Sequence, residues 1–362
     1  MFLRNKALVL TIFLSTILLF STSGAYADVQ GLIITDMTGR QVELSSGAER
    51  VIAIGPGALR LCAYFKNVEM IVGIEQMDKG NPLGKPYVIA NPSYADLPLI
   101  GPGGPNNAPD PEKILAVRPD VIFSTYGDRA SADKLQSKTG IPVVAISYGT
   151  TAVFDPDSYD SIKLIGQVTG QPERAQAIVD YMEACRRDLY DRTKDIADAD
   201  KPSVYMGALN MKGAHGIEST QGDYALFNAV NAKNVVDELG RTGSIMIDKE
   251  KLIGWNPDII FLDGGGIEAV QQDYNKNSRY YRVLAAVRND QVYAQLPYNY
   301  YTTNIDTAIA NAYYIGKVLY PSEFEDIEPV VKANEIYRFL LGKELYSQMA
   351  ADFGGYMKVK LD

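Results

Sequence analysis

Two stretches of the chain repeat one pattern of residues, and this internal repeat restricts the fold more than any other sequence feature. Residues 112–123 read EKILAVRPDVIF, and residues 250–261 read EKLIGWNPDIIF. Both stretches begin with Glu-Lys, pass through Pro-Asp and end on Ile-Phe at the same spacing. Each stretch is typical of a helix, a turn and a buried strand. Because the pattern occurs twice, the sequence predicts two lobes of similar construction.

A long helical segment, residues 155–197, separates the two repeats. It begins at Asp155 and pauses at Gly170-Gln171-Pro172, where the proline suits the first turn of a helix. Beyond the pause, apolar residues recur at three- and four-residue steps, which indicates one helical stripe: Ala175, Ile178, Val179, Met182, Cys185 and Leu189. About 25 helical residues form a rod ~38 Å long, enough to run along two packed lobes. The alternative is one helix within a large single domain.

Strands alternate with helices on both sides of this segment, which favours mostly parallel sheets covered on both faces. In the first lobe we expect a hairpin (31–44), strands at 50–54, 70–74, 120–124 and 143–147, helices near 59–65, 110–115 and 130–139, and a Pro- and Gly-rich loop at 80–110. In the second lobe we expect a strand at 203–206 and helices at 224–230, 305–319, 335–341 and 344–351. The predicted fold is α/β, with two Rossmann-like lobes with parallel-type central sheets joined by one long α-helix.

The beginning of the chain is typical of a secretory signal peptide. Arg4 and Lys6 precede an apolar run at 7–20, and a small-residue pattern ends at Ala27. A membrane anchor is the alternative, but the apolar run is short for a bilayer span. No cysteine lies near the predicted cleavage point, so a lipoprotein anchor is not expected. The predicted parts are therefore a signal peptide (1–27), an N-terminal lobe (28–154), a connecting segment (155–198) and a C-terminal lobe with closing helices (199–362).

The net charge limits the kinds of partner that the exported protein can bind, and the cysteine content limits its disulfide bonding. The net charge is −9, and removing residues 1–27 removes Arg4 and Lys6 and no acidic residue, so it becomes −11. An acidic exported chain is a poor candidate for binding nucleic acid or anionic membranes. The two cysteines, Cys62 and Cys185, lie in helical apolar patterns, so packed thiols are expected. A single bridge between them is the alternative in an oxidising compartment.

The paired lobes, the long helix and the repeated Glu-Lys…Pro-Asp pattern resemble the substrate-binding proteins of ABC importers for iron chelates, haem and cobalamin. The segment 166–175 (GQVTGQPERA) carries the same resemblance. The resemblance implies a periplasmic monomer without a cofactor that holds its ligand between the lobes and delivers it to a permease dimer with a cytoplasmic ATPase. It also implies that Glu112 and Glu250 dock on arginines of the two permease subunits. Alternatively, each glutamate only stabilises its helix N-terminus.

The ligand is expected at the carboxyl ends of the strands, where loops of both lobes meet. From the first lobe the candidates are Gly55, Pro56, Asn106, Asn107, Tyr126, Arg129 and Tyr148. From the second they are Lys212, His215, Glu218, Gly265, Tyr298, Asn299, Tyr300 and Tyr301. Tyrosine combines apolar area with a polar tip, which suits an organic chelate or a ligand with oxygen acceptors. Arg129 and Lys212 would favour an anion if they enter the cleft.

His215, the one histidine of the chain, lies near glycines and could bind a metal, hydrogen-bond an oxyanion or act as a structural hydrogen-bonding residue of its loop. A bare transition metal needs several His, Cys or carboxylate ligands, so it fits less well than a chelate. We therefore rank an iron chelate of siderophore, haem or corrinoid type first and a molybdate or tungstate oxyanion second. The remote alternative is an exported enzyme that uses His215, but no nucleophile elbow or zinc-protease motif occurs.

Overall fold

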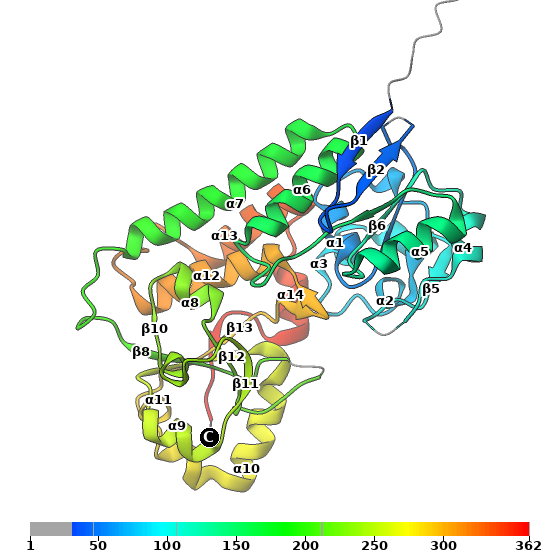
Figure 1. Ribbon diagram of the computed structural model, residues 1–362. Coiled ribbons are helices and arrows are strands. Elements are labelled where there is room, and N and C mark those ends of the chain that lie inside the picture. Colours follow the sequence, from blue (N-terminus) through cyan, green and yellow to red (C-terminus); the bar gives the residue numbers. More distant parts are fainter. Residues whose placement is uncertain (1–30, 46, 106, 211–212, 362) are drawn as a thin grey trace, which may run out of the picture.

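The computed structural model describes residues 31–45, 47–105, 107–210 and 213–361. It shows two lobes bridged by helices, with the N-terminal lobe on the right of Figure 1 and the C-terminal lobe at the lower left. The predicted signal peptide, residues 1–27, lies outside the described residues. Within the described part of the chain, no helix combines the length and apolarity needed to cross a bilayer. The α/β class with parallel sheets is confirmed.

The N-terminal lobe contains a parallel sheet in the order β3-β6-β7 and a parallel pair, β4-β5. A parallel bridge joins Val51 of β3 to Ile71, just before β4. The predicted hairpin is also present as the antiparallel pair β1-β2. The strands are β1 (Leu32–Thr35), β2 (Gln41–Leu44), β3 (Val51–Ile54), β4 (Ile74–Glu75), β5 (Leu99–Gly101), β6 (Val121–Ser124) and β7 (Val143–Ala145). The helices are α1 (Ala58–Ala63), α2 (Gln76–Lys79), α3 (Pro86–Ala90), α4 (Pro111–Ala116) and α5 (Arg129–Thr139).

Two local predictions in this lobe were wrong. The segment 80–110, expected to be a loop, contains α3, a 3₁₀ helix (Pro92–Asp96) and β5. Pro86 and Pro92 each open a helix, at positions where a missing N–H costs nothing, so proline there marks a helix start. Of the strand expected at 70–74 only Ile74 lies in β4, because Met70 ends a 3₁₀ turn and Ile71 forms only an isolated bridge to Val51.

The connecting segment is two helices, α6 (Pro156–Val168) and α7 (Pro172–Thr193), which fold back on each other. The chain turns at Gly170, whose φ is +67°. A Cβ atom on Gly166 would lie 2.4 Å from the Cβ of Ala175, so this glycine lets the two helices pack closely. The connecting rod is therefore α7 alone, 22 residues and ~33 Å long. This geometry explains why the segment 166–175 carries small residues at both ends.

The C-terminal lobe has a five-stranded sheet in the order β10-β8-β12-β13-β16, in which only β16 is antiparallel to its neighbour. Its strands are β8 (Ser203–Gly207), β9 (Ser219–Gly222), β10 (Lys233–Asn234), β11 (Gly243–Met246), β12 (Ile259–Asp263), β13 (Val292–Gln295), β14 (Asn299–Tyr300), β15 (Thr302–Thr303) and β16 (Met357–Lys358). Its helices are α8 (Ala225–Ala229), α9 (Lys249–Trp255), α10 (Ile267–Arg282), α11 (Ala285–Arg288), α12 (Ile305–Leu319), α13 (Pro329–Leu341) and α14 (Tyr346–Phe353). The pairs β9-β11 and β14-β15 are separate two-stranded antiparallel sheets, and β14-β15 is a tight hairpin.

The sequence repeat corresponds to α4-β6 in one lobe and α9-β12 in the other. The repeated aspartates accept equivalent backbone hydrogen bonds in the two lobes. Asp120 accepts hydrogen bonds from the backbone N–H groups of Glu49 and Arg50 at 2.9 and 2.8 Å, at the start of β3. Asp258 accepts one from the backbone N–H of Ser203 at 2.8 Å, at the start of β8. Each aspartate thus fastens the adjacent parallel strand to its own.

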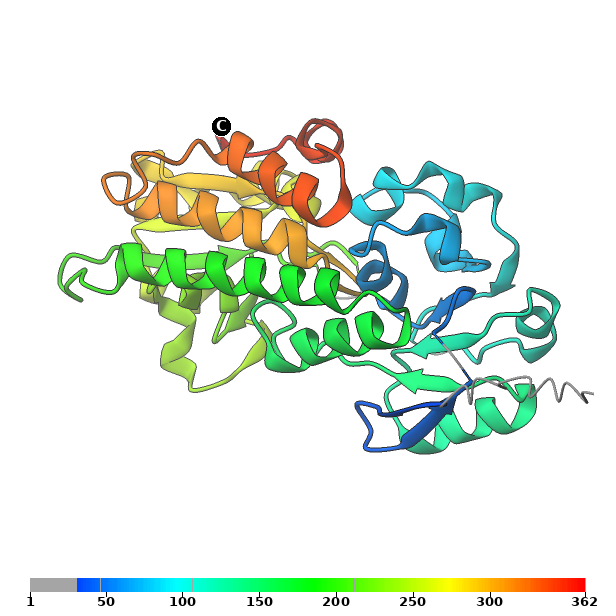
Figure 2. The same ribbon diagram turned by 90° about the horizontal axis from the view of Figure 1, so that it is seen from above.

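The two lobes share one apolar core. A continuous cluster of buried side chains runs from β3 and α1 through α6 and α7 to α12 and α13, and Figure 2 shows α12 and α13 lying alongside α7. Cys62 and Cys185 both belong to this cluster as buried free thiols. Arg174 of α7 adds a polar link, since it donates to the carbonyls of Tyr64 and Phe339 at 2.7 Å each. The apolar core thus continues from one lobe into the other without a break.

Candidate functional site

Loops at the carboxyl ends of β3, β6 and β7 form one side of the candidate site. These strands are parallel neighbours, so the residues that follow them meet at one edge of the sheet. Gly55, directly after β3, has a φ of +86°, and a Cβ there would lie 2.6 Å from Oγ1 of Thr125. The Tyr148 hydroxyl donates to the carbonyl of Gly57 at 2.9 Å, which ties the third loop to the first.

The hairpin β14–β15 of the C-terminal lobe forms the opposite wall. A Cβ atom on Gly57 would lie 2.3 Å from Cγ2 of Thr302, so this glycine permits the close approach of the hairpin. Tyr301 lies at the turn of the hairpin, with a φ of +59° and a side chain that is 62% exposed. Tyr300 and Tyr301 have ring centroids 5.1 Å apart in an edge-to-face arrangement. The tyrosine-rich loop predicted from the sequence therefore reaches the N-terminal lobe.

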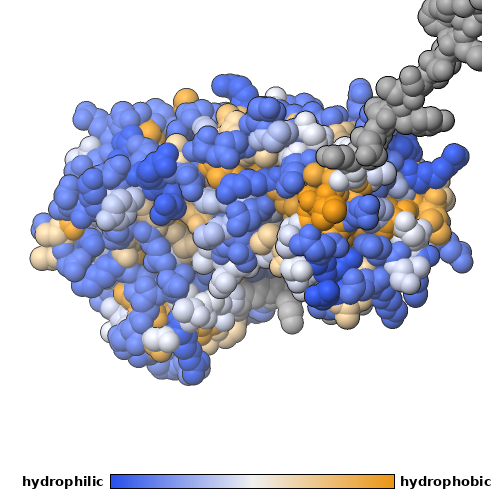
Figure 3. Space-filling view, turned by 45° about the horizontal axis from the view of Figure 1, so that its top comes forward, coloured by the Kyte–Doolittle hydropathy of each residue, from blue (hydrophilic) through white to orange (hydrophobic). Residues whose placement is uncertain are grey.

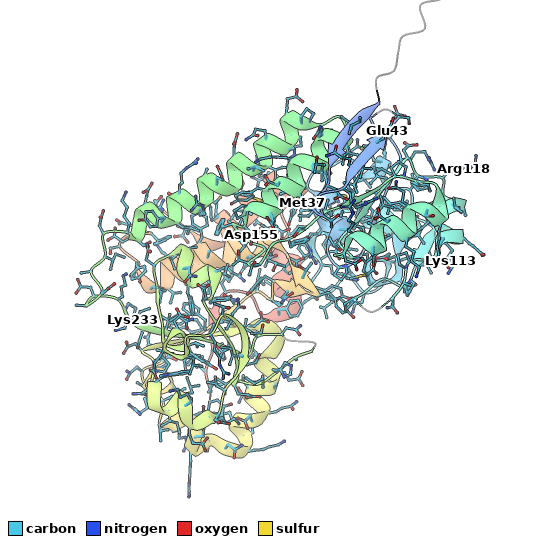
Figure 4. All side chains as sticks on the ribbon, in the orientation of Figure 1. Met37, Glu43, Lys113, Arg118, Asp155 and Lys233 are labelled. Atoms are coloured by element: carbon cyan, nitrogen blue, oxygen red, sulfur yellow. The ribbon has the colours of Figure 1, made fainter. Side chains whose placement is uncertain are left out.

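Between these walls lies a pocket of about 340 Å³. Its lining residues are Met37, Thr38, Pro56, Thr125, Gly127, Ala145, Ile146, Ser147, Tyr148, Tyr301 and Thr302. Six of these residues carry hydroxyl groups, and none of those that line it carries a charge. Met37 lies near the junction of the lobes, whereas Lys113 and Lys233 lie toward the outer ends of the molecule (Figure 4). Three of these hydroxyls already donate within the protein, Thr38 to Asp36, Thr125 to Pro56 and Tyr148 to Gly57. The neutral donors that the pocket offers are therefore the hydroxyls of Ser147, Tyr301 and Thr302.

A group of buried charged side chains lies beside the pocket. Arg60 of α1 is fully buried, and its guanidinium lies 4.9 Å from the ring centroid of Tyr87. The Tyr87 hydroxyl donates to Asp78 at 2.5 Å. Glu75 accepts hydrogen bonds from the backbone N–H of Gly55 at 2.8 Å and from the Tyr126 hydroxyl at 3.4 Å. Burial raises the pKa of Glu75 to about 7, although the Gly55 donor lowers it in part.

The structure brings some of the predicted residues together and leaves others apart. Pro56, Tyr148 and Tyr301 line the pocket, and Gly55, Tyr126 and Tyr300 lie next to its walls. Asn299 is exposed on β14, and Tyr298 is buried with its ring 6.3 Å from that of Tyr224. Asn107 donates to the carbonyl of Gly103 at 2.5 Å and lines, together with Tyr126, a separate pocket of about 230 Å³. Asn106 and Lys212 lie outside the described residues.

Four further candidates also do not line the pocket. Arg129 is exposed at the start of α5, with its Nε atom 3.8 Å from a carboxylate oxygen of Asp133. His215 lies beside the loop after β12, since a Cβ on Gly266 would be 2.7 Å from its carbonyl oxygen. Gly265 lies in that same loop, and Glu218 accepts a backbone hydrogen bond from Ile247 at 3.0 Å. Among the described residues, no group of three or more His, Cys, Asp or Glu could hold a metal ion.

Sequence reasoning missed the buried charges and most of the hydroxyls. Arg60 interrupts the otherwise apolar run Ala58–Ala63, and a charged residue inside a buried helix is a signal that could have been read. Glu75 ends β4 and Asp78 lies within α2, between the strand expected at 70–74 and the loop expected at 80–110, where the sequence analysis predicted no element. Thr302 carries no such signal, since a single threonine beside three tyrosines is not distinguished by its sequence context.

A comparison with known families decides the identity. The model of a family described as periplasmic binding protein matches residues 51–297, more than half of the chain. The chain belongs to this family. The resemblance inferred from the repeat is thereby confirmed: this is a class III periplasmic binding protein of ABC importers, and proteins of this kind work with a cognate permease and ATPase. Family membership supports a binding role over an enzymatic one.

Relatives of this periplasmic binding protein carry different ligands. The molybdate-binding protein MolA of Haemophilus influenzae is 24% identical over 354 residues, 93% of this chain and 96% of that protein. A structure of MolA bound to molybdate has a TM-score of 0.68 at 23% identity, covering 86% of this chain and 98% of MolA. FepB of Veillonella parvula has a TM-score of 0.67 at 25% identity, covering 86% and 97%. An iron-uptake system-binding protein of Bacillus subtilis is 28% identical over 202 residues, 53% of this chain and 60% of that protein.

Proposed function

We propose that this binding protein captures a small tetrahedral metal oxyanion of the molybdate or tungstate type in the pocket between Tyr148 and Thr302. The hydroxyl lining of the pocket carries this proposal. Hydroxyl groups donate short, charge-assisted hydrogen bonds to oxyanions, which offsets the cost of removing the anion from water. The volume of about 340 Å³ is at the lower end of the range for drug-sized ligands, so it suits a small oxyanion better than a corrinoid. The likeness to MolA supports the same ligand class.

A metal chelate, which the sequence ranked first, is the second candidate. Tyr301 is more than half exposed at the edge of the pocket and offers a flat surface to an organic ligand. The iron-uptake relative supports this candidate. A chelate would have to extend from the pocket along the exposed hairpin.

Native mass spectrometry with metal analysis distinguishes the two candidates. The mature protein is purified gently from its own cells, and its bound ligand is identified by mass and metal content. A second sample is titrated calorimetrically with molybdate, tungstate, sulfate and a ferric chelate. A small adduct containing molybdenum or tungsten, with heat released by those two anions, is the expected result. A bound mass of several hundred daltons that contains iron or cobalt would instead support the chelate.

Delivery to the permease is the second part of the proposal. We propose that Glu112 and Glu250 are the docking residues on the two lobes and that the protein is exported to the periplasm. Both glutamates are exposed in the first turn of equivalent helices, α4 and α9. The face seen in Figure 3 is mostly hydrophilic, as expected of a protein that meets its membrane partner only transiently.

Replacing Thr302 with valine tests the hydroxyl lining. The change keeps the shape of the side chain and removes one donor, so affinity for molybdate should fall by roughly 10-fold, the effect of one hydrogen bond to a charged group. Isothermal titration calorimetry measures the change. The matched control is Thr303→Val, because Thr303 is the next residue of the same hairpin and does not line the pocket. Equal losses in both variants would contradict the assignment.

Ionisation of Glu75 should make binding of the oxyanion depend on pH. The raised pKa means that Glu75 gains its negative charge as the pH rises through about 7, next to Gly55 and Tyr126. Molybdate affinity should therefore fall by roughly 10-fold between pH 6 and pH 8 through charge repulsion. Glu75→Gln, which cannot ionise, should bind equally at both pH values. A pH dependence that persists in this variant would exclude Glu75 as its source.

A further inference from the structure

The hairpin β14–β15 belongs to the C-terminal lobe in sequence, but its polar contacts are with the N-terminal lobe. Arg60 of α1 donates from Nη1 to the carbonyl of Thr303 at 3.2 Å and from Nη2 to the carbonyl of Tyr300 at 3.3 Å. The ammonium group of Lys85 lies 4.9 Å from the ring centroid of Tyr300. The buried guanidinium of Arg60 in the N-terminal lobe therefore donates hydrogen bonds to both strands of the hairpin.

The residues that follow the hairpin are attached to the N-terminal lobe in the same way. The Asn304 side chain donates to the carbonyl of Gly84 at 2.8 Å. The Tyr64 hydroxyl of the N-terminal lobe donates to the carboxylate of Asp306 at 3.0 Å. The close approach of Thr302 to Gly57 adds van der Waals contact to these hydrogen bonds. The whole stretch 300–306 is thus fastened to the N-terminal lobe.

The environment of Arg60 makes this attachment hard to release. The side chain is 0% exposed, and the carboxylates of Asp78 and Asp306 interact with its charge from the two lobes. Its Nε atom has no hydrogen-bond acceptor among the described residues. A buried guanidinium that loses its acceptors is costly, so separating the hairpin from α1 would leave an unpaired charge in the core. The buried guanidinium of Arg60 therefore holds the hairpin to α1 more firmly than a solvent-exposed ion pair would.

We infer that the hairpin β14–β15 moves with the N-terminal lobe as one rigid unit, and that Arg60 is the positioning residue that holds it there. The walls of the 340 Å³ pocket are then assembled before any ligand arrives. Relative movement of the lobes takes place between this unit and the sheet of the C-terminal lobe. Such preorganisation lowers the entropy cost of capture. The inference does not depend on which ligand the protein carries.

Distances between paired spin labels test the inference. One pair joins Tyr301→Cys on the hairpin to Ser137→Cys on α5, within the N-terminal lobe, and the other joins Tyr301→Cys to Lys276→Cys on α10, in the C-terminal lobe. All three sites are surface positions, and the native Cys62 and Cys185 are buried, so labelling is selective. In the wild-type background, the 301–137 distance distribution should be narrower than the 301–276 distribution. A 301–137 distribution at least as broad as the 301–276 distribution would overturn the inference.

Substitution of Arg60 is the decisive part of the experiment, and it requires no ligand. In Arg60→Met the 301–137 distribution should become at least twice as wide, and in Arg60→Lys, which keeps the charge with fewer donors, it should widen less. The matched control is Arg174→Met, because Arg174 also links carbonyls of both lobes but lies away from the hairpin; its 301–137 distribution should stay narrow. If Arg60→Met does not fold, Asn304→Ser replaces it. An unchanged width in the folded Arg60 variants, or in Asn304→Ser, would overturn the role of the link.

Discussion

A double variant with Glu112→Lys and Glu250→Lys should bind its ligand with unchanged affinity but support almost no uptake. A single close charge pair at an interface can be worth ~1.5–7 kcal/mol, so reversing both charges should reduce transport by roughly 100-fold or more. Ligand affinity should not change, because neither glutamate lines the pocket. Uptake of radiolabelled ligand by cells that express the cognate permease measures the effect, and calorimetry measures binding.

The internal repeat gives a structural reason for this expectation. In both lobes the aliphatic residue after the glutamate-lysine pair is buried, whereas the next one is exposed: Leu115 is 44% and Ile253 is 41% exposed. Each lobe therefore presents a carboxylate and an aliphatic side chain three residues apart, on one face of a short helix. Two such surfaces, one on each lobe, match a permease dimer with two-fold symmetry.

Glu173→Lys provides the matched control for the docking variant. Glu173 follows the first proline of α7, just as Glu112 follows the first proline of α4, and both are exposed. Any loss of helix stability from reversing a charge at a helix N-terminus should therefore be similar in the two places. Uptake should stay near the wild-type level in Glu173→Lys. If this control lost uptake as well, docking through Glu112 and Glu250 would not be the cause.

The sequence predicted the parts of the fold that repeat or follow a regular period. The two lobes, the strands before Ser124 and Asp263, and the helix that ends near Thr193 were all visible as patterns. The break between α6 and α7 was noted as a pause, but the reversal of direction was not predicted. That reversal depends on the close contact between Gly166 and Ala175. The hydrophobic periodicity of the sequence does not indicate such a contact.

The candidate site was predicted only where chemistry is visible in a single loop. Tyr148 and Tyr301 were found because they follow strands and carry large polar side chains. The link between Arg60 and the carbonyls of Thr303 and Tyr300 joins residues about 240 positions apart. Such a link arises from the packing of the two lobes and leaves no local signal. For the same reason, Arg129 was a sound candidate by spacing but lies exposed beside Asp133.

Asp263→Asn should stabilise the protein strongly at pH 8 and much less at pH 5. Asp263 ends β12, is 1% exposed, and accepts one hydrogen bond, from the backbone N–H of Gly265 at 2.9 Å. Burial raises its pKa to about 7, and the single donor only partly opposes this. The native state therefore binds the proton more tightly than the unfolded state does. The stability that this provides is complete below pH ~4 and is lost as the pH rises through 7.

Asparagine removes the ionisation and can still accept the hydrogen bond from Gly265. At pH 8 the free energy of unfolding should therefore be larger in the variant by up to ~4 kcal/mol, since each pKa unit corresponds to ~1.4 kcal/mol. Urea unfolding at both pH values measures it. Asp155→Asn is the contrasting control: Asp155 accepts backbone hydrogen bonds from Thr150, Thr151 and Asp157, and although burial opposes them, these donors lower its pKa. That variant should lose stability at pH 8, because the carboxylate it removes is the favoured form. A pH-independent difference between Asp263→Asn and the wild type would show that burial of this carboxylate costs nothing.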